Sequence, residues 1–316
     1  MAKDNYHDKG YKELLSKKRN FIKFLRHFVK TEWVKHVNED SLYLCDKGFV
    51  DSFFKELESD LIYSAKVADR DVYFYILTEL QSSVDYTMPF RIFKYVSAIL
   101  MRAFDDAPQE KRERADFRLP MIVPILFYNG DESWTVSQDF KDYLQGSELF
   151  DGVIDFRYNL VDIKFLERGY LLKNHDAICA AIAVDKVRGE GFGELFETLW
   201  EIAGSKTGFD PEDFKDFLTW LKHTLAHRVG SEDEAEKIIG LIEEGDENMI
   251  RTGIDILFDN AEARGEARGE ARGVVEAAVR LLNKGKELQE VADLLDLTDE
   301  QVKQAELRAG LKRDFA

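Results

Sequence analysis

The chain of 316 residues contains few cysteines and no long apolar segment, and both absences narrow its class. Cys45 and Cys179 lack the spacing of a metal-binding motif, and we expect reduced thiols rather than a disulfide. No run of about 18 apolar residues occurs, so no transmembrane helix and no membrane partner are expected. The first residues also lack the apolar core of a secretion signal, which favours a cytoplasmic protein.

Several widespread catalytic motifs are missing as well. The glycines at 189–193 have neither the spacing nor the preceding strand of a phosphate-binding loop, so we expect no nucleotide cofactor. A Gly-x-Ser-x-Gly nucleophile elbow is absent. His223 and His227 could share one helix face, but the glutamate of the metalloprotease pattern does not follow His223.

Charge is distributed unevenly along the chain. The net charge of −17 opposes broad nucleic-acid binding, which requires neutralisation of phosphates. Residues 1–30 nevertheless carry nine basic against three acidic side chains, whereas residues 186–260 carry eight against eighteen. The first segment could contact phosphates, and the later one should repel them. Alternatively, the basic side chains form only the solvent-exposed face of a helix. They are Lys17, Lys18, Arg19, Lys23 and Arg26.

Hydrophobic periodicity predicts an α/β sheet domain followed by a helical region. The predicted elements of the first part are a helix over 11–30, a helix and loop over 31–48, strands over 49–54, 58–63 and 73–81, a helix over 90–104, an exposed charged segment over 105–118, a buried strand over 119–128 and a weaker strand over 154–160. The predicted helices of the later part cover 196–203, 211–227, 232–244 and 249–258.

The last part of the chain begins with three copies of Glu-Ala-Arg-Gly at residues 262–273. Like charges four residues apart weaken an isolated helix, and each glycine costs about 1 kcal/mol relative to alanine. The repeat is therefore a flexible linker, or a helix stabilised by a partner. The pattern of residues 274–307 predicts three short helices, and Thr298 begins a capping box. These helices form a small interaction module or a helix-turn-helix. The expected regions are 1–165, 166–260, 261–273 and 274–316.

The predicted hairpin brings carboxylates together. If the polar break at 68–71 is a symmetric loop, Ala68 pairs with Asp71, and Asp60 lies opposite Glu79. Gln81 shares the face of Glu79 because side chains alternate along a strand. Directly opposed carboxylates repel unless a hard cation such as Mg²⁺ lies between them. Alternatively, the acids diverge on a solvent-exposed face, or a bulge shifts the register.

Such a site has the chemistry of a metal-dependent hydrolase. A metal ion on Asp60 and Glu79 could lower the pKa of a bound water and neutralise charge on a phosphodiester. The third position usually carries a lysine, and Gln81 can hydrogen-bond water without supplying a positive charge. Arg91 or Lys94, on the next predicted helix, could reach back to the substrate.

The order of these motifs resembles the PD-(D/E)XK nuclease family transposases, the Rpn or YhgA-like recombination-promoting nucleases. The matching segments are residues 7–12, 59–63, 79–83, 88–91 with Tyr95, 119–130 with Trp134, and 154–162. The resemblance implies a restriction-endonuclease-like mixed sheet with flanking helices, followed by an α-helical carboxyl-terminal region. It also implies bacterial DNA cleavage dependent on Mg²⁺, or on Mn²⁺ or Ca²⁺, in recombination, mobile elements or phage defence.

Carried over to this sequence, the resemblance makes Asp60 and Glu79 metal ligands and puts Gln81 in the place of the lysine. A homodimer is expected, because a double-strand break often needs two active sites. This sequence departs from the family pattern in Gln81 and in having no proline before Asp60. The alternative hypothesis is therefore a weakly active or inactive nuclease-fold protein, which acts as an interaction or regulatory module through its acidic helical half.

Overall fold

A computed structural model describes residues 5–45, 61–79, 84–130, 132–152, 154–187, 192–229, 231–244 and 273–309. The chain divides into two compact units, Met1–Arg251 and Thr252–Ala316, and each is described by itself. Within the described ranges, every helix is too short or too polar to cross a membrane.

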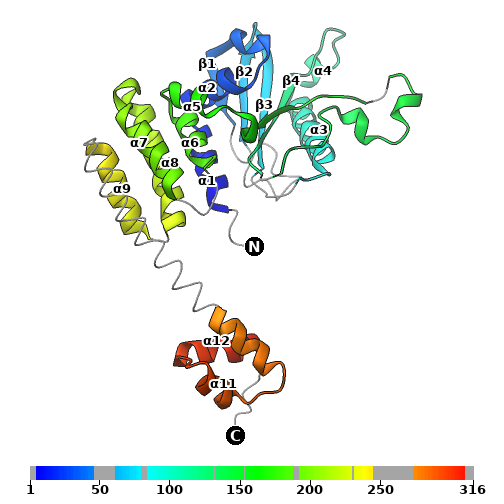
Figure 1. The fold of residues 1–316 in the computed structure, drawn as a ribbon. Coiled ribbons are helices and arrows are strands. Elements are labelled where there is room, and N and C mark those ends of the chain that lie inside the picture. Colours follow the sequence, from blue (N-terminus) through cyan, green and yellow to red (C-terminus); the bar gives the residue numbers. More distant parts are fainter. Residues whose placement is uncertain are drawn as a thin grey trace. The chain divides into compact units, whose positions relative to one another are not determined.

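The larger unit is built on a mixed sheet (Figure 1). Its described strands are β1 (Val37–Leu44), β2 (Leu61–Val67), β3 (Arg70–Glu79), β4 (Met121–Tyr128) and β5 (Asn159–Asp162). They lie side by side in sequence order, with β1, β2 and β3 antiparallel and with β4 and β5 parallel to β3. A parallel pair needs a crossover, and α3 (Met88–Asp106) supplies it between β3 and β4. The predicted α/β fold with a mixed sheet is confirmed.

Helices cover both faces of this sheet (Figure 1). On one face lie α1 (Asn5–Leu15) and α2 (Lys18–Phe28), and the ring of Phe21 stacks on Tyr63 with 4.2 Å between centroids. On the other face α3 packs Tyr95 against Tyr75 at 5.2 Å between centroids. Since side chains alternate along a strand, neighbouring residues of β3 serve opposite cores.

After residue 165, the described part of the larger unit is mostly helical, as predicted. Its helices are α5 (Arg168–Lys173), α6 (Ala177–Asp185), α7 (Phe192–Gly204), α8 (Pro211–Val229) and α9 (Glu232–Glu244). A short α4 (Gln109–Arg112) lies in the exposed segment after α3, and the 3-10 helices are η1 (Glu32–His36), η3 (Phe140–Tyr143), η4 (Ser147–Leu149), η5 (Ile163–Phe165) and η6 (Lys206–Gly208). Buried Trp220 of α8 lies against Tyr11 of α1, with ring centroids 5.5 Å apart. The acidic helical region is thus packed onto the amino-terminal helices.

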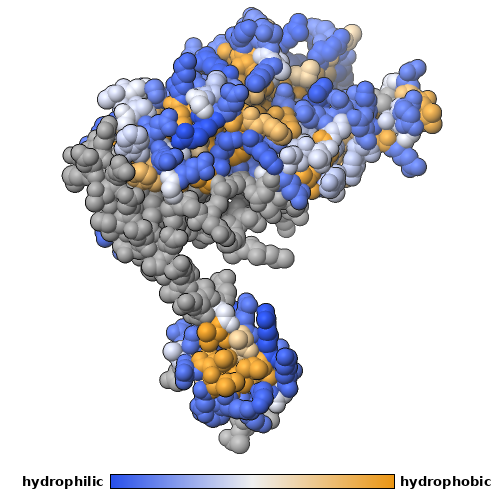
Figure 2. Space-filling view, in the orientation of Figure 1, coloured by the Kyte–Doolittle hydropathy of each residue, from blue (hydrophilic) through white to orange (hydrophobic). Residues whose placement is uncertain are grey.

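The smaller unit contains helical residues 273–282, α11 (Leu288–Leu294) and α12 (Asp299–Ala309), which confirms the three predicted helices. Its core contains Val275, Leu282 and Val291, and Figure 2 shows apolar side chains gathered on its visible face. The predicted capping box is present. The Thr298 backbone N–H donates to Gln301 Oε1 at 2.9 Å, and the Gln301 backbone N–H donates to Thr298 Oγ1 at 3.4 Å.

Three predicted elements differ from the structure. The single helix over 11–30 is wrong, because α1 ends at Leu15 and α2 begins at Lys18. The buried Tyr63 hydroxyl donates to the carbonyls of Leu15 at 3.0 Å and Ser16 at 2.6 Å, and so satisfies the end of α1. The helix and loop over 31–48 contain η1 and the strand β1 instead. Strand β5 begins at Asn159 rather than at residue 154.

Other predictions lie outside the described residues. They are the strand over 49–54, the helix over 249–258 and the repeat up to residue 272.

The hairpin of β2 and β3 is confirmed, but its predicted register is wrong. Val67 pairs with Arg70, and Leu61 pairs with Ile76, so that paired residue numbers sum to 137 rather than 139. The turn consists of Ala68 and Asp69, whose φ angles of 47° and 63° are both left-handed. Such a turn matches the twist of the two strands, and here it lies one residue earlier than predicted.

Candidate functional site

The carboxyl-terminal end of β3 holds the one predicted carboxylate ligand that falls within the described residues. Glu79 is the last residue of β3 and pairs with Tyr128, the last residue of the parallel strand β4. Asp60 and Gln81 lie outside the described residues. In open α/β sheets, ligands bind beyond the carboxyl ends of parallel strands, and Glu79 is at this edge.

Arg91 and Lys94 lie on α3, which covers the face of the sheet that carries Tyr75. The helix begins after a turn in which Asp85 Oδ1 accepts from the backbone N–H of Thr87 at 2.8 Å and from its hydroxyl at 2.6 Å. Arg91 Nη1 donates to Asp85 Oδ2 at 2.7 Å. Burial opposes ionisation of Asp85, but the hydrogen bonds from Thr87 and Arg91 outweigh it and lower its pKa. The Arg91 guanidinium is therefore held beside the start of α3.

A buried carboxylate, which the sequence analysis did not identify, lies just beyond β4. Asp185, the last residue of α6, accepts a hydrogen bond from the Tyr11 hydroxyl at 3.1 Å and another from the Asn129 amide. All three residues are buried, and Asn129 directly follows β4. Hydrogen bonds to a buried charged group contribute about 1.5–3 kcal/mol each. This group therefore fixes α1, α6 and the end of β4 to one another.

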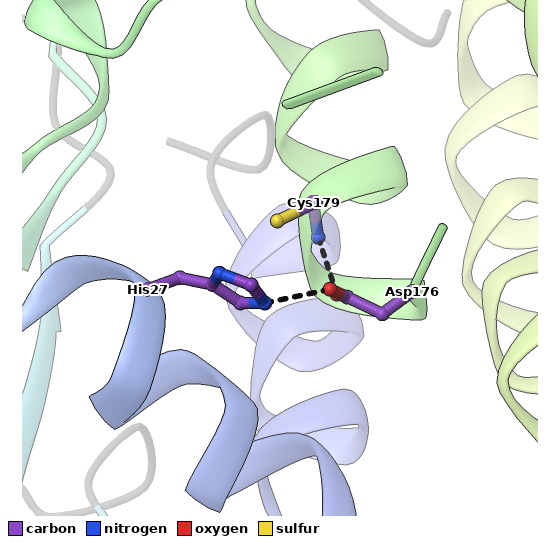
Figure 3. Close-up of side chains that lie close together, drawn as sticks. All are labelled: His27, Asp176 and Cys179. Carbon is purple, nitrogen blue, oxygen red and sulfur yellow. Dashed lines mark hydrogen bonds and ion pairs between the residues drawn. The ribbon is translucent and has the colours of Figure 1, made fainter. Parts of the chain in front are cut away.

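A second buried group joins α2 to the start of α6 (Figure 3). Asp176 is the N-cap of α6, and its Oδ1 accepts from the backbone N–H of Cys179 at 2.9 Å. His27 Nε2 lies 2.8 Å from Asp176 Oδ2, and His27 Nδ1 lies 2.9 Å from the Tyr170 hydroxyl. One ligand atom from each of His27, Asp176 and Cys179 lies within 4.8 Å of the other two.

Burial and charge act differently on the members of this group. Burial opposes ionisation of Asp176, but the hydrogen bonds from His27 and from the Cys179 backbone lower its pKa. Burial, followed by the charge of Asp176, raises the pKa of the Cys179 thiol far above its ordinary value. Sequence reasoning missed this group because residue 27 and residues 176–179 belong to distant segments with no common motif.

The basic side chains of α2 meet the acidic start of α8. Lys17 Nζ lies 2.6 Å from Asp216 Oδ1, and Arg19 Nη2 lies 2.7 Å from Asp216 Oδ2. Arg19 Nε is 2.9 Å from Asp213 Oδ1, and Lys23 also pairs with Asp213. These contacts show that the face formed by Lys17, Arg19 and Lys23 is ion-paired rather than purely solvated, and contact with phosphates stays a prediction. Three basic side chains of residues 1–30 are thus ion-paired with two aspartates of α8.

Comparison with known proteins identifies the family. The family model described as "Putative transposase, YhgA-like" matches residues 5–212, more than half of the chain. The recombination-promoting nuclease RpnC of Escherichia coli K12 is 26% identical over 297 residues, which cover 92% of this chain and 93% of RpnC. RpnD of Escherichia coli O157:H7, also named a recombination-promoting nuclease, is 32% identical over 147 residues, 44% of this chain and 52% of RpnD.

A further relative carries a different description. The inactive recombination-promoting nuclease-like protein RpnE of Escherichia coli K12 is 28% identical over 158 residues, 50% of each chain. This chain thus spans about half the length of RpnD and of RpnE. No solved structure matches the chain significantly. From the extent of the family match and the series of Rpn relatives, the chain belongs to the Rpn/YhgA-like family of transposase-related proteins.

Proposed function

We propose that the protein is a divalent-metal-dependent DNA endonuclease, which hydrolyses phosphodiester bonds in recombination, mobile-element transfer or phage defence. The names of RpnC and RpnD support a nuclease of this kind. The structural observation behind the proposal is the position of Glu79 at the end of β3, beside the end of the parallel strand β4. In open α/β sheets, ligand sites lie beyond the carboxyl ends of such strands.

The observed register removes the basis for a direct opposition of Asp60 and Glu79, and Asp60 lies outside the described residues. The described parts of β2 and β3 are paired two residues away from the predicted register. The proposal is that Asp60 supplies a second carboxylate to a cation held by Glu79, at the oxygen–metal distances of about 2.0–2.6 Å that such ions require.

Each proposed site residue then has a distinct role. Asp60 and Glu79 would hold Mg²⁺ or another hard divalent cation, and both offer the oxygen ligands that such ions prefer. A bound ion of this class lowers the pKa of its water and offsets charge on the phosphodiester. Gln81 would orient the attacking water through its amide, but as a neutral group it adds no charge stabilisation. We expect slower turnover than with a lysine at this position.

Arg91 and Lys94 would bind the DNA backbone. They lie one helical turn apart near the start of α3, which covers the Tyr75 face of the sheet, and alternation along β3 assigns position 79 to that same face. A phosphate approaching Arg91 would compete with Asp85 for its guanidinium. A homodimer would supply the two active sites that a double-strand break needs.

A catalytically weak or inactive protein with an interaction role is the second candidate. Two observations favour it: Gln81 stands where a lysine would supply charge, and the related RpnE is named inactive. The two candidates differ in whether phosphodiester hydrolysis depends on Asp60 and Glu79.

Nicking of supercoiled plasmid DNA distinguishes the candidates. We expect the wild-type protein to nick with Mg²⁺ or Mn²⁺ and not with EDTA, and Asp60→Ala and Glu79→Gln to lose about 100-fold or more of the rate. The matched control is Asp69→Asn, since the Asp69 carboxylate is exposed in the β2–β3 turn. Equal nicking by all four proteins, or none by the wild type with either metal, would reject the endonuclease.

The DNA-binding role of α3 has its own test. Arg91→Ala and Lys94→Ala should raise KM for plasmid or oligonucleotide substrate while largely preserving kcat, because they remove contacts made before and during the reaction alike. Unchanged KM in both variants would remove these residues from substrate binding without touching the metal site.

A further inference from the structure

The group that joins α2 to α6 offers three chemically different ligand atoms in one place (Figure 3). We propose that His27 Nε2, Asp176 Oδ2 and Cys179 Sγ form a binding site for a thiophilic divalent metal ion such as Zn²⁺. This site is independent of the proposed nuclease centre, which uses only oxygen ligands and lies at the end of β3. It would link the second helix of the chain to the start of α6.

The ligand atoms are already close to the spacing that such an ion requires. A tetrahedral zinc site has Zn–N and Zn–O distances of about 2.0–2.2 Å and a Zn–S distance of about 2.3 Å, which puts ligand atoms about 3.3–3.7 Å apart. In the structure the three atoms lie within 4.8 Å of one another, and the shortest pair, His27 Nε2 and Asp176 Oδ2, is 2.8 Å apart. Binding therefore needs the His27–Asp176 pair to open slightly, to about 3.3 Å.

The neighbours of the ligands orient them as metal ligands are oriented. His27 Nε2–H donates to Asp176 Oδ2, and a bound metal ion would take the place of this proton. The Tyr170 hydroxyl, 2.9 Å from His27 Nδ1, could then accept from Nδ1–H and hold the ring with Nε2 toward the ion. The backbone N–H of Cys179 donates to Asp176 Oδ1 at 2.9 Å, so that Oδ2, which now accepts from His27, is the oxygen that would bind the cation. Both contacts are of the kind that fixes ring and carboxylate orientation around a bound metal.

Charge balance favours a divalent ion with this ligand set. The Asp176 carboxylate and a Cys179 thiolate together carry two negative charges, which a divalent cation neutralises in a buried place where net charge is costly. The Asp176 side chain is 7% exposed and the His27 side chain 19%, so the ion would enter past the imidazole.

The thiolate distinguishes this site from an oxygen-only site. Soft sulfur ligands select Zn²⁺ and similar transition metals, whereas Mg²⁺ prefers oxygen. Cobalt(II) serves as the probe, because a cobalt–thiolate bond gives a near-ultraviolet charge-transfer band that carboxylates and imidazoles do not. The chain has two cysteines, Cys45 and Cys179, so each has a matched variant.

The experiment titrates the full-length, reduced protein with Co²⁺. We expect a stoichiometric charge-transfer band in the wild type and in Cys45→Ser, displaced by Zn²⁺ and not by Mg²⁺. Cys179→Ser should abolish the band, and His27→Gln should weaken Co²⁺ binding at least about 10-fold. The partly exposed His27 gives a second variant if substitution at the buried cysteine prevents folding, which circular dichroism would report.

Two outcomes would overturn the site. The first is the absence of a thiolate band in the folded wild-type protein. The second is a band that persists in Cys179→Ser and disappears in Cys45→Ser. Neither outcome depends on nuclease activity, and Asp60→Ala should bind Co²⁺ at this site as the wild type does.

Discussion

Replacement of Asp216 by alanine should destabilise the larger unit by about 3 kcal/mol. The Asp216 carboxylate accepts hydrogen bonds from Lys17 Nζ at 2.6 Å, Arg19 Nη2 at 2.7 Å and Asn20 Nδ2 at 2.9 Å. Its side chain is only 9% exposed, and Asn20 is fully buried. The residue therefore connects Lys17, the N-cap of α2, and two donors within α2 to α8.

The magnitude follows from what each donor loses. Breaking a buried ion pair costs about 3–5 kcal/mol, and a buried amide left without its acceptor costs about 1–3 kcal/mol. The side chains of Lys17 and Arg19 are 41% and 30% exposed and regain water, which reduces their share. Because about 1 kcal/mol corresponds to about 2–4 °C in a unit of this size, Tm should fall by about 6–12 °C.

Thermal and urea denaturation, followed by circular dichroism, would measure the loss. Glu212→Gln is the matched control on the same helix, since Glu212 also pairs with Arg19 but its side chain is 80% exposed. That substitution should cost less than about 1 kcal/mol. If Asp216→Ala were no more harmful than Glu212→Gln, the network between α2 and α8 would contribute nothing measurable. A double-mutant cycle with Lys17→Ala would assign the share of that pair.

The same network predicts a pH dependence. Burial opposes ionisation of Asp216, but hydrogen bonds from Lys17, Asn20 and Arg19 outweigh it and lower its pKa. A carboxylate with a lowered pKa in the folded state stabilises the protein above its unfolded pKa of about 3.9, and this contribution disappears as the pH falls through the folded pKa. The stability difference between wild type and Asp216→Ala should therefore be constant above about pH 5 and shrink below about pH 4.

Three further substitutions test local features. Tyr63→Phe leaves two carbonyls at the end of α1 without their donor and should cost about 1–2 kcal/mol in urea denaturation, and an unchanged midpoint would contradict this. Asp69 has a left-handed φ of 63°, which glycine adopts without steric cost, so Asp69→Gly should stabilise the hairpin by about 0.5–1 kcal/mol. A lower Tm for this variant would contradict that expectation. Thr298→Ala removes the capping box with Gln301 and should cost about 1 kcal/mol, measured by faster amide exchange in α12 alone.

The best-predicted elements are those whose burial requires a simple pattern of apolar side chains along the sequence. Strand β4 lies between two helical layers, so nearly every side chain from residue 121 to 128 is apolar. The three helices of the smaller unit bury one face each and start or end at recognisable residues, including Thr298. In both cases the cause is local along the chain, and periodicity alone reveals it.

Strand β1 was missed because its side chains carry little of that pattern. Its sequence, Val-Asn-Glu-Asp-Ser-Leu-Tyr-Leu, is mostly exposed, and Leu42 is its one buried side chain. It lies at the edge of the sheet and is held by backbone pairing with β2, which does not depend on apolar side chains. An edge strand of this kind has no period-two alternation for sequence reasoning to detect.

The hairpin register shows how far turn chemistry can be predicted from sequence. A polar break at 68–71 allowed turns centred on 68–69 or 69–70, and neither Ala68 nor Asp69 is the glycine that usually marks a left-handed position. The structure places both residues there and shifts the pairing by two. A shift of two preserves the face of every side chain in the paired strands, although it changes which residues lie directly opposite each other.

The ion pairs of the basic residues were the hardest feature to predict from the sequence, because the paired residues are far apart in the chain. Lys17 and Asp216 are 199 residues apart, yet their atoms lie 2.6 Å from each other. Helix α8 begins at Pro211, close to the end of the family match at residue 212, and it also buries Trp220 against Tyr11.

Whether the acidic helical region inhibits DNA binding cannot be tested by cutting the chain after residue 185, because the loss of α8 would expose the core of α1 and α2. Neutralising Glu212, whose side chain is exposed, would test it with the fold intact: a regulatory role for its charge predicts tighter DNA binding by Glu212→Gln, whereas a purely structural α8 predicts no change.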